Sequence, residues 1–274
     1  MKKWKYALSA APEAPDDAPI LLTGDICTCL RNAASLGYDA IEYHTRETAD
    51  LPYDEIIRTM QETGCQISMI VTGRIATQGG LHLVSDDPEK ERACVEGFHR
   101  YVDMASKLGA GLVIGWAKGN VHSPADLPLY YERLAHNLGI IERYAAEKCV
   151  PIVIEVINHY EVSVFQTADL LMKFLAANDL PNCKAHLDSF HMFVEEVDIH
   201  AAIDQCSGRL GYVHLADYGR YEPGHGKFDF ESMLKHLDEI GYDGYLAIEC
   251  KHIGDRMETA RKGIEYLKQL EQNL

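Results

Sequence analysis

Short apolar runs alternate with longer amphipathic runs along the whole chain. Eight of the short runs are nearly continuously apolar, which is typical of parallel strands covered on both faces. They comprise residues 5–10, 39–44, 66–73, 111–117, 151–158, 183–190, 210–217 and 245–250. Helical runs lie between them, for example at residues 53–64, 89–109 and 125–148. The alternation predicts an α/β fold, a closed (β/α)₈ TIM barrel, although periodicity alone does not exclude a doubly wound open sheet.

The length agrees with this prediction. The chain has 274 residues, and a barrel of this kind needs about 250. Hydrophobic residues make up 47% of the chain, which is enough for one large core, and no low-complexity or Pro/Ser-rich linker divides it. Several predicted helices end in glycine, which permits the left-handed conformation that closes a helix. We therefore expect one barrel domain over residues 1–274.

The charge balance excludes some classes of partner. The chain has 26 Lys and Arg against 42 Asp and Glu, a net charge of −16, which opposes binding to nucleic acid because phosphate contacts need positive charge. No stretch approaches the roughly 20 apolar residues of a membrane helix. The basic start at residues 1–5 is followed by too short an apolar part for a signal peptide. We expect a cytoplasmic protein with a small-molecule partner, and neither nucleic acid nor membrane.

The eight cysteines are scattered along the chain. In a chain of this length without an export signal, we expect them to be reduced and buried. Several lie in strand-like runs: Cys65, Cys149, Cys183 and Cys250. Cys27 and Cys29 form a CxC pair with no second pair at zinc-site spacing, so the pattern does not indicate a cysteine metal site.

Four polar residues interrupt the last four predicted strands near their C-terminal ends: Glu155, Asp188, His214 and Glu249. A single buried carboxylate is explained by a helix cap or a lysine partner. Four in register are different, because neighbouring parallel strands lie about 4.8 Å apart and their ends can converge on one point. Three carboxylates and one imidazole make an oxygen-rich site that suits one divalent ion, Mn²⁺ first, with Mg²⁺ or Co²⁺ as alternatives.

Long loops are expected after several strands, at residues 74–87, 118–124, 191–197 and 218–228. In such barrels the strand-to-helix loops build the active site. Glu161, His191 and Arg220 lie just beyond the strand ends. Each alone is an ordinary surface residue, but together they could bind a hydroxylated ligand. Glu42, at the end of the second strand, could support the site or form a structural salt bridge.

These stretches resemble the sugar isomerase/epimerase group of the xylose isomerase-like barrels, especially the ketose 3-epimerases for D-tagatose and D-psicose. The resemblance covers nearly the whole chain and is densest in EVINHYE (155–161), HLDSFHMFVEE (186–196), HLADYGRYEPGHGKFDF (214–230) and IEC (248–250). It implies four ligands for one divalent metal ion: Glu155, Asp188, His214 and Glu249. It also implies Glu155 and Glu249 as the acid/base pair, and it implies three substrate contacts: Glu161, His191 and Arg220.

Some positions depart from the family pattern. His159 stands where Arg is common, and Phe193 stands where Asn is common. Residues 72–89 and the KFDF at 227–230 look closer to the branch that includes 5-keto-L-gluconate epimerase. The resemblance therefore implies either a small ketose or a keto sugar acid, whose carboxylate could meet one of three cations: Arg74, Lys118 or Arg220. Relatives are often dimers or tetramers, which implies a homo-oligomer.

The implied reaction is metal-dependent epimerisation. A proton leaves the carbon next to the carbonyl, a cis-enediolate forms, and a proton returns on the opposite face to invert C3. The same site could run an aldose–ketose isomerisation of the hydroxypyruvate type or an inosose-type dehydration. An apurinic-site endonuclease on this barrel would need several metals and a basic surface. A sugar-binding protein without activity would not need a glutamate base on each face.

Overall fold

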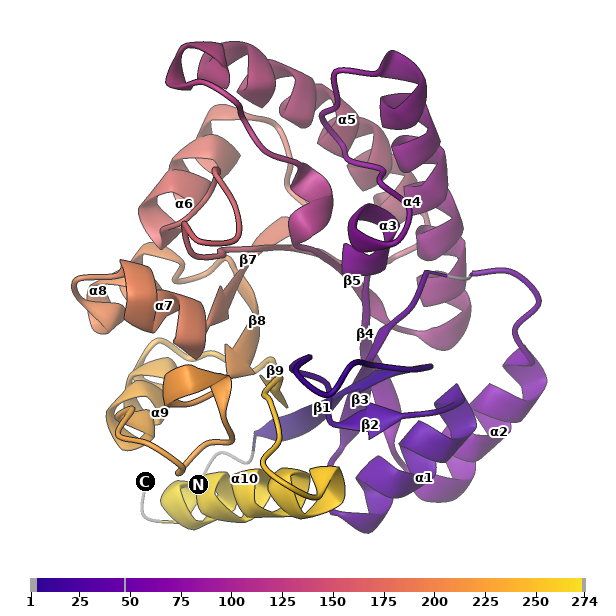
Figure 1. The fold of residues 1–274 in the computed structure, drawn as a ribbon, viewed down its shortest axis with the longest axis vertical. Helices are drawn as coiled ribbons and strands as arrows, with labels where there is room; N and C mark the ends of the chain where they lie inside the picture. The colour runs from indigo at the N-terminus through magenta and orange to yellow at the C-terminus, as the bar shows by residue number, and fades with distance from the viewer. Residues whose placement is uncertain (1–3, 47, 273–274) are drawn as a thin grey trace.

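The computed structural model describes residues 4–46 and 48–272. Its strands follow the order β2-β1-β3-β4-β5-β6-β7-β8-β9, and β1 also pairs with β9, so the sheet closes on itself (Figure 1). The barrel strands are β1 (Lys5–Ala11), β3 (Ala40–His44), β4 (Gln66–Val71), β5 (Gly111–Ile114), β6 (Ile152–Glu155), β7 (Cys183–Asp188), β8 (Leu210–Leu215) and β9 (Tyr245–Ile248). The prediction of a (β/α)₈ barrel is confirmed, and the doubly wound alternative is wrong because Lys5–Leu8 pairs in parallel with Tyr245–Ile248.

Helices surround the strands as an outer ring (Figure 1). The longer ones are α1 (Ile26–Ser35), α2 (Tyr53–Thr63), α4 (Pro88–Leu108), α5 (Leu127–Glu147), α6 (Ala168–Ala177), α9 (Phe230–Glu239) and α10 (Arg256–Glu271). Asp25 and Asp255 accept from backbone N–H groups in the first turns of α1 and α10, which satisfies donors without partners inside the helix. Gly64 and Gly109 close α2 and α4 at φ 74° and 67°, as the sequence predicts.

Six of the eight barrel strands end two or three residues earlier than the apolar runs predict, whereas β3 ends where predicted and β1 ends one residue later. Asp188 shows the reason on β7, because its side chain accepts from the backbone N–H of Phe190 and starts α7 (Ser189–Glu195). The expected loop at 191–197 is thus mostly helix, and the loop at 74–87 begins with α3 (Gly73–Thr77). Three 3₁₀ turns and short segments complete the fold: η1 (Trp116–Lys118), η2 (Pro124–Asp126), η3 (Tyr218–Arg220), α8 (Ile199–Gln205) and β2 (Leu22–Thr23).

The core has two layers. Most apolar side chains pack between the barrel strands and the surrounding helices. A smaller cluster fills the barrel itself with mostly small and β-branched residues: Ala7, Ala40, Met69, Val71, Val113, Val153, Tyr212 and Ala247. Polar side chains also point into the barrel, among them Glu42 and His186. The expectation of buried cysteines is wrong for Cys149, which is exposed because it lies in the turn before β6 with φ 56°.

Over residues 4–46 and 48–272, no helix is both long enough and apolar enough to cross a membrane. Lys2 and Lys3, which supply the basic start weighed as part of a signal peptide, lie outside the described residues.

Candidate metal and active site

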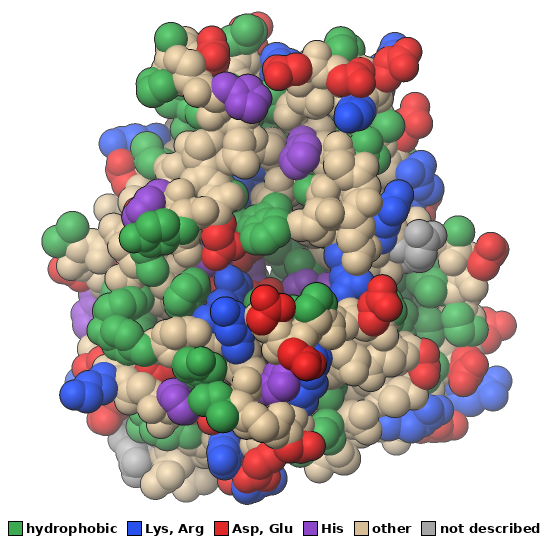
Figure 2. Space-filling model, viewed as in Figure 1, with side chains coloured by type: hydrophobic (Ala, Val, Ile, Leu, Met, Phe, Trp, Pro, Cys, Tyr) green, Lys and Arg blue, Asp and Glu red, His purple; other side chains and the backbone are tan. Residues whose placement is uncertain are grey.

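The last four strands each deliver one polar side chain to the same end of the barrel. Glu155 and Asp188 are the final residues of β6 and β7, His214 is the next-to-last residue of β8, and Glu249 directly follows β9. Their possible ligand atoms all lie within 4.8 Å of one another, and all four residues are buried. Figure 2 shows a hollow at the centre of the face viewed down the barrel, with acidic, basic and histidine side chains at its rim. The structure therefore brings together the four residues predicted as metal ligands.

Two atoms of this cluster are buried without a hydrogen-bond partner: Asp188 Oδ2 and His214 Nδ1. They lie 3.8 Å apart, and His214 Nδ1 lies 3.9 Å from a Glu155 oxygen and 3.6 Å from a Glu249 oxygen. These separations are too long for hydrogen bonds, and each unpartnered buried polar atom costs about 1–3 kcal/mol. A cation among the four side chains would give both atoms a partner, so this donor set fits a divalent metal ion.

Glu42 on β3 fixes the orientation of His214. Its Oε2 accepts from His214 Nε2 at 2.7 Å, and its Oε1 lies 3.4 Å from His44 Nε2. With the hydrogen on Nε2, Nδ1 of a neutral His214 ring presents its lone pair to the three carboxylates. A carboxylate behind a ligating histidine is the usual device for selecting this tautomer. Burial would raise the pKa of Glu42, but the charge and hydrogen bond of His214 outweigh burial and hold this pKa below its ordinary value.

The acids of the cluster differ in proton affinity. Burial, together with the charges of Glu249 and Asp188, raises the pKa of Glu155 to about 8 against the opposing charge of His214. Burial would raise the pKa of Asp188 as well, but the nearby His191, Arg220 and His214 side chains lower it below its ordinary value. Without a metal ion, the pKa values of these two neighbouring carboxyl groups are therefore shifted in opposite directions, which is common at functional sites.

Gly115, directly after β5, leaves room for the Glu155 carboxylate. A Cβ atom at this position would come within 2.6 Å of Glu155 Oε2. Lys118 supports the same residue from behind: its side chain is fully buried, and Nζ donates to the Glu155 carbonyl at 2.8 Å. This placement does not support the expectation that Lys118 could meet a substrate carboxylate, because the side chain has no exposed surface and its ammonium group bonds to the protein.

The three predicted substrate contacts lie around the cluster. Arg220 forms an ion pair with Glu249, and its guanidinium lies 3.5 Å from Asp188 Oδ2 and 3.4 Å from a Glu161 oxygen. Glu161 also accepts from the Trp116 indole at 3.2 Å, and Trp116 is 43% exposed. Arg220 and Glu161 therefore link the four clustered side chains to the exposed ring of Trp116.

His191 is oriented by a residue that carried no role in the sequence analysis, although it lies inside the EVINHYE stretch. The Asn158 carbonyl oxygen accepts from the Tyr160 backbone N–H at 3.0 Å, which fixes the amide orientation. The Asn158 NH₂ group then donates to His191 Nδ1 at 2.7 Å. His191 Nε2 consequently carries the hydrogen, and it lies 3.8 Å from Glu155 and 3.7 Å from Asp188. The site thus has a neutral N–H donor beside its carboxylates.

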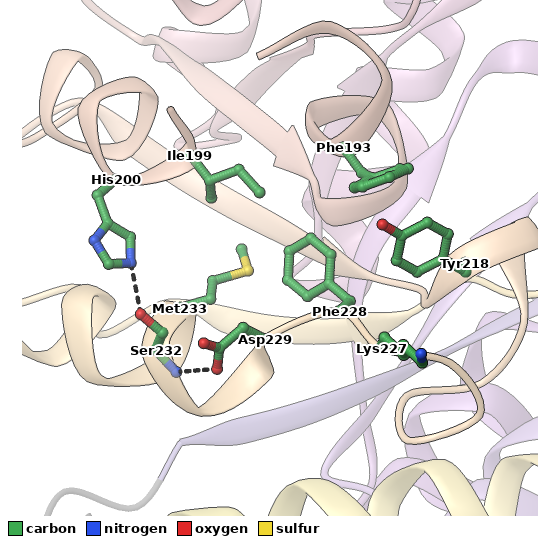
Figure 3. A pocket seen from close by; sticks show the side chains of 9 residues that line it. All are labelled: Phe193, Ile199, His200, Tyr218, Lys227, Phe228, Asp229, Ser232 and Met233. Atoms are coloured by element: carbon green, nitrogen blue, oxygen red, sulfur yellow. Dashed lines mark hydrogen bonds between the residues drawn. The ribbon is translucent and has the colours of Figure 1, made fainter. Parts of the chain in front are cut away.

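A second hollow of about 190 Å³ lies between α7, α8, η3 and α9 (Figure 3). None of the four clustered residues lines it. Phe193 and Tyr218 line it on the right of the view with ring centroids 4.0 Å apart, and both residues are more than one-third exposed. The other departure from the family pattern, His159, pairs with Glu195 at the surface. His159 and Phe193, the two departures, therefore lie outside the group of Glu155, Asp188, His214 and Glu249.

Comparisons with known proteins agree with this site and fold. A family model described as xylose isomerase-like TIM barrel matches residues 30–270. A ketose 3-epimerase from Arthrobacter globiformis is 27% identical over 217 residues, which cover 78% of this chain and 73% of that protein. A 3-dehydro-D-guloside 4-epimerase from Escherichia coli K12 is 25% identical over 248 residues, covering 87% and 92%.

Solved structures give the same fold. A D-allulose 3-epimerase from Methylomonas sp., determined in complex with D-allulose, superposes with a TM-score of 0.82 at 23% identity and covers 98% of each chain. The match of the family model spans most of the described barrel. This chain therefore belongs to the xylose isomerase-like TIM barrel family, and its curated relatives are sugar epimerases, in agreement with the ketose 3-epimerase group of isomerases that its sequence resembles.

Proposed function

We propose that this protein is a metal-dependent epimerase that inverts the carbon next to the carbonyl of a small keto sugar. Glu155, Asp188, His214 and Glu249 would hold one divalent ion, preferably Mn²⁺, and Glu155 and Glu249 would also move the proton. The observation that supports this most is the placement of the two glutamates. They stand at the ends of β6 and β9, with β7 and β8 between them, so they would reach the centre of the site from its two sides.

Inversion without a redox cofactor needs an acid/base group on each face of the reacting carbon. The bound ion would polarise the carbonyl and acidify the adjacent C–H. One glutamate would take the proton and leave an enediolate, and the other would return a proton to the opposite face.

The surrounding residues would hold the substrate oxygens. His191 Nε2–H would donate to the oxygen on which negative charge develops, as a donor that Asn158 orients in advance. Arg220 would balance the carboxylates around it, and Glu161 would accept from a hydroxyl group. The exposed Trp116 ring would cover an apolar edge of the sugar.

A neutral keto sugar fits the site better than a keto sugar acid. Each cation expected to meet a substrate carboxylate is already engaged: Arg74 by the Glu13 carbonyl, Lys118 by the Glu155 carbonyl, and Arg220 by Glu249. The names of the relatives point to one shared reaction, since a ketose 3-epimerase and a 3-dehydro sugar 4-epimerase both invert a carbon beside a ketone.

The test is a panel of neutral ketoses, 3-keto glycosides and keto sugar acids, assayed in D₂O with the Mn²⁺-loaded protein. We expect an epimer that carries deuterium only at the inverted carbon. Deuterium at the former carbonyl carbon of an aldose product would instead indicate an isomerase, and loss of water by mass spectrometry would indicate a dehydratase. Product without solvent deuterium would contradict the proton-transfer mechanism, and preferred turnover of keto acids would contradict the neutral substrate.

A further inference from the structure

Asp217 is a buried carboxylate at the start of the loop that carries Arg220. It lies two residues after β8 and is 2% exposed. Its oxygens accept from four backbone N–H groups of this loop at 2.7 to 3.2 Å: Tyr218 and Phe228 at Oδ1, and Gly224 and Gly226 at Oδ2. Hydrogen bonds to an ionised carboxylate are roughly twice as strong as those between neutral groups. One side chain therefore holds the loop at both of its ends.

The Pro-Gly-His-Gly turn at residues 223–226 lets the loop close around this carboxylate. A Cβ atom at Gly226 would lie 2.5 Å from Asp217 Oδ1. At Gly224, φ is 90° and a Cβ atom would lie 2.7 Å from the Tyr266 ring on α10. The loop can therefore take this path only with glycine at both positions.

Arg220 has a backbone conformation that non-glycine residues rarely adopt. Its φ is 65°, and the φ of Gly219 before it is 68°. A residue with a Cβ atom keeps such a strained angle only where the surrounding structure imposes it. Two hydrogen bonds close the turn: the Arg220 N–H donates to the Asp217 carbonyl at 2.9 Å, and the Lys251 N–H donates to the Arg220 carbonyl at 2.6 Å. The loop around Asp217 is the structure that imposes the angle here.

This conformation places the Arg220 guanidinium among three carboxylates. The guanidinium pairs with Glu249 and lies 3.5 Å from Asp188 Oδ2 and 3.4 Å from a Glu161 oxygen. The Lys251 N–H that bonds to the Arg220 carbonyl belongs to the segment that carries Glu249, two residues earlier. A return of φ to its ordinary range would turn the Cα–Cβ bond of Arg220 and move the guanidinium out of this group.

We propose that Asp217 is a positioning residue for Arg220. By holding the loop closed, it keeps Arg220 in the left-handed conformation from which the guanidinium reaches Glu249 and the substrate. The inference rests on the proposed function and adds to it a side chain that itself contacts neither the ion nor the substrate. Because the four hydrogen bonds form within the protein alone, the guanidinium is fixed in advance and the site need not reorganise when substrate binds.

The first test is the variant Asp217→Asn, which keeps the shape of the side chain. Its NH₂ group cannot accept from two of the four N–H groups and would repel them, so the loop should open. We expect crystal structures of the wild type and the variant to show that the guanidinium has left Glu249. An unmoved Arg220 in the variant would overturn the inference, and this result does not depend on any activity. If Asp217→Asn does not fold, Gly226→Ala gives the same test, because its new methyl group would press on Asp217 Oδ1.

Kinetics then separate positioning from general support of the fold. With Mn²⁺ and the ketose that the wild type converts best, Asp217→Asn should lower kcat/KM by about 10²-fold, the effect of misplacing a group by about 1 Å. In an Arg220→Ala background the same change should lower kcat/KM no further, although it should lower the melting temperature in both backgrounds. A similar loss of kcat/KM in both backgrounds would mean that Asp217 does not act through Arg220, which would overturn the inference.

Asp229→Ala is the matched control. Asp229 also accepts from a backbone N–H, that of Ser232, but in the first turn of α9 at the far end of the same connection. Its loss should lower the melting temperature, as expected for a helix cap, and leave kcat/KM unchanged. An equal fall in kcat/KM would show that any weakening of this connection lowers activity, and the inference would be wrong. If the wild type converts no ketose, the proposed function fails, and the position of Arg220 in the crystal structures alone decides the inference.

Discussion

The two halves of the barrel mouth use buried carboxylates in different ways. In the half formed by β1, β3, β4 and β5, both oxygens of Glu42 face a histidine nitrogen. In the half formed by β6 to β9, Asp188 Oδ2 has no hydrogen-bond partner and lies 3.8 Å from His214 Nδ1. The first half therefore supplies a carboxylate that orients His214 by a hydrogen bond. The second half supplies polar atoms that have no partner in the protein and could bind a ligand.

The surroundings of a carboxylate distinguish a residue that supports the site from one that acts in it more clearly than the residue type does. Glu42 and Glu155 are both buried glutamates at strand ends, but the pKa of Glu42 is lowered by His214 whereas the pKa of Glu155 is raised by burial and by like charges. Both oxygens of Glu42 thus face histidines, whereas Asp188 keeps one oxygen without a hydrogen-bond partner. The following experiments test whether the two halves really divide the work in this way.

Metal removal should have the largest effect. Exhaustive chelation should reduce turnover to background, because the proposed reaction depends on the ion held by the β6–β9 half. Added Mn²⁺ should restore the turnover. Added Mn²⁺ should also raise the melting temperature. The free energy of unfolding should increase by about 2.7 kcal/mol when the free ion is at 100 times its Kd. Full turnover in protein shown by elemental analysis to be free of metal would contradict the proposal.

Glu155→Gln and Glu249→Gln should each lower kcat by about 10²–10⁴-fold, the range for loss of a general acid/base group. Each variant should also lose deuterium exchange into one of the two epimers while retaining it in the other, because each glutamate serves one face. Glu161→Gln is the control, and it should change KM more than kcat. Symmetric loss of exchange in both variants would refute the assignment of one base to each face.

Gly115→Ala should lower kcat/KM by about 10²-fold, the effect of moving a catalytic group by about 1 Å. The new methyl group would push on the Glu155 carboxylate. Gly139→Ala on α5 is the control, since its Cβ would meet only the end of the Arg143 side chain at 3.4 Å. Crystal structures of both variants would show whether Glu155 has moved; an unmoved Glu155 with lost activity would be inconsistent with this explanation.

Glu42→Gln should weaken Mn²⁺ binding by about 10–100-fold, as expected when the residue behind a ligating histidine is altered. Titration calorimetry measures this directly. Tyr43→Phe, the neighbouring residue whose hydroxyl bonds to the Gly24 carbonyl outside the barrel, should leave the affinity unchanged. Equal affinity in Glu42→Gln and the wild type would mean that the first half of the mouth does not support the metal site.

Ser9→Ala should have the smallest effect on function. The Ser9 hydroxyl accepts from the Leu21 N–H and donates to the Pro19 carbonyl. Its loss should cost about 1–3 kcal/mol of folding stability, the value for a buried donor left unpaired, with no change in the Kd for Mn²⁺. Chemical denaturation and a Mn²⁺ titration check both parts, and a change in Kd would show that β1 also contributes to the site.

Much of the fold and part of the candidate site could be predicted from local patterns. Apolar runs located all eight barrel strands, and glycines marked the ends of α2 and α4. The ends of six strands were placed too late, because apolar residues continue past the last backbone hydrogen bond of the sheet and a side chain such as Asp188 decides where the next helix begins. Asn158 and Gly115 carried no signal of their own, since an asparagine or a glycine in a loop has many ordinary explanations.

The sequence by itself determined the barrel and the register of four polar side chains on its last strands, because hydrophobic period and strand spacing are local properties of the chain. Only the tertiary structure decided which polar atoms find partners. Closure of β1 against β9 brings the β3 residue Glu42 to within 2.7 Å of His214, 172 residues away. Folding also buries Lys118 completely and joins its ammonium group to the Glu155 carbonyl. Whether a carboxylate supports, binds or transfers a proton depends on neighbours that are distant in sequence, because desolvation and charge act through space.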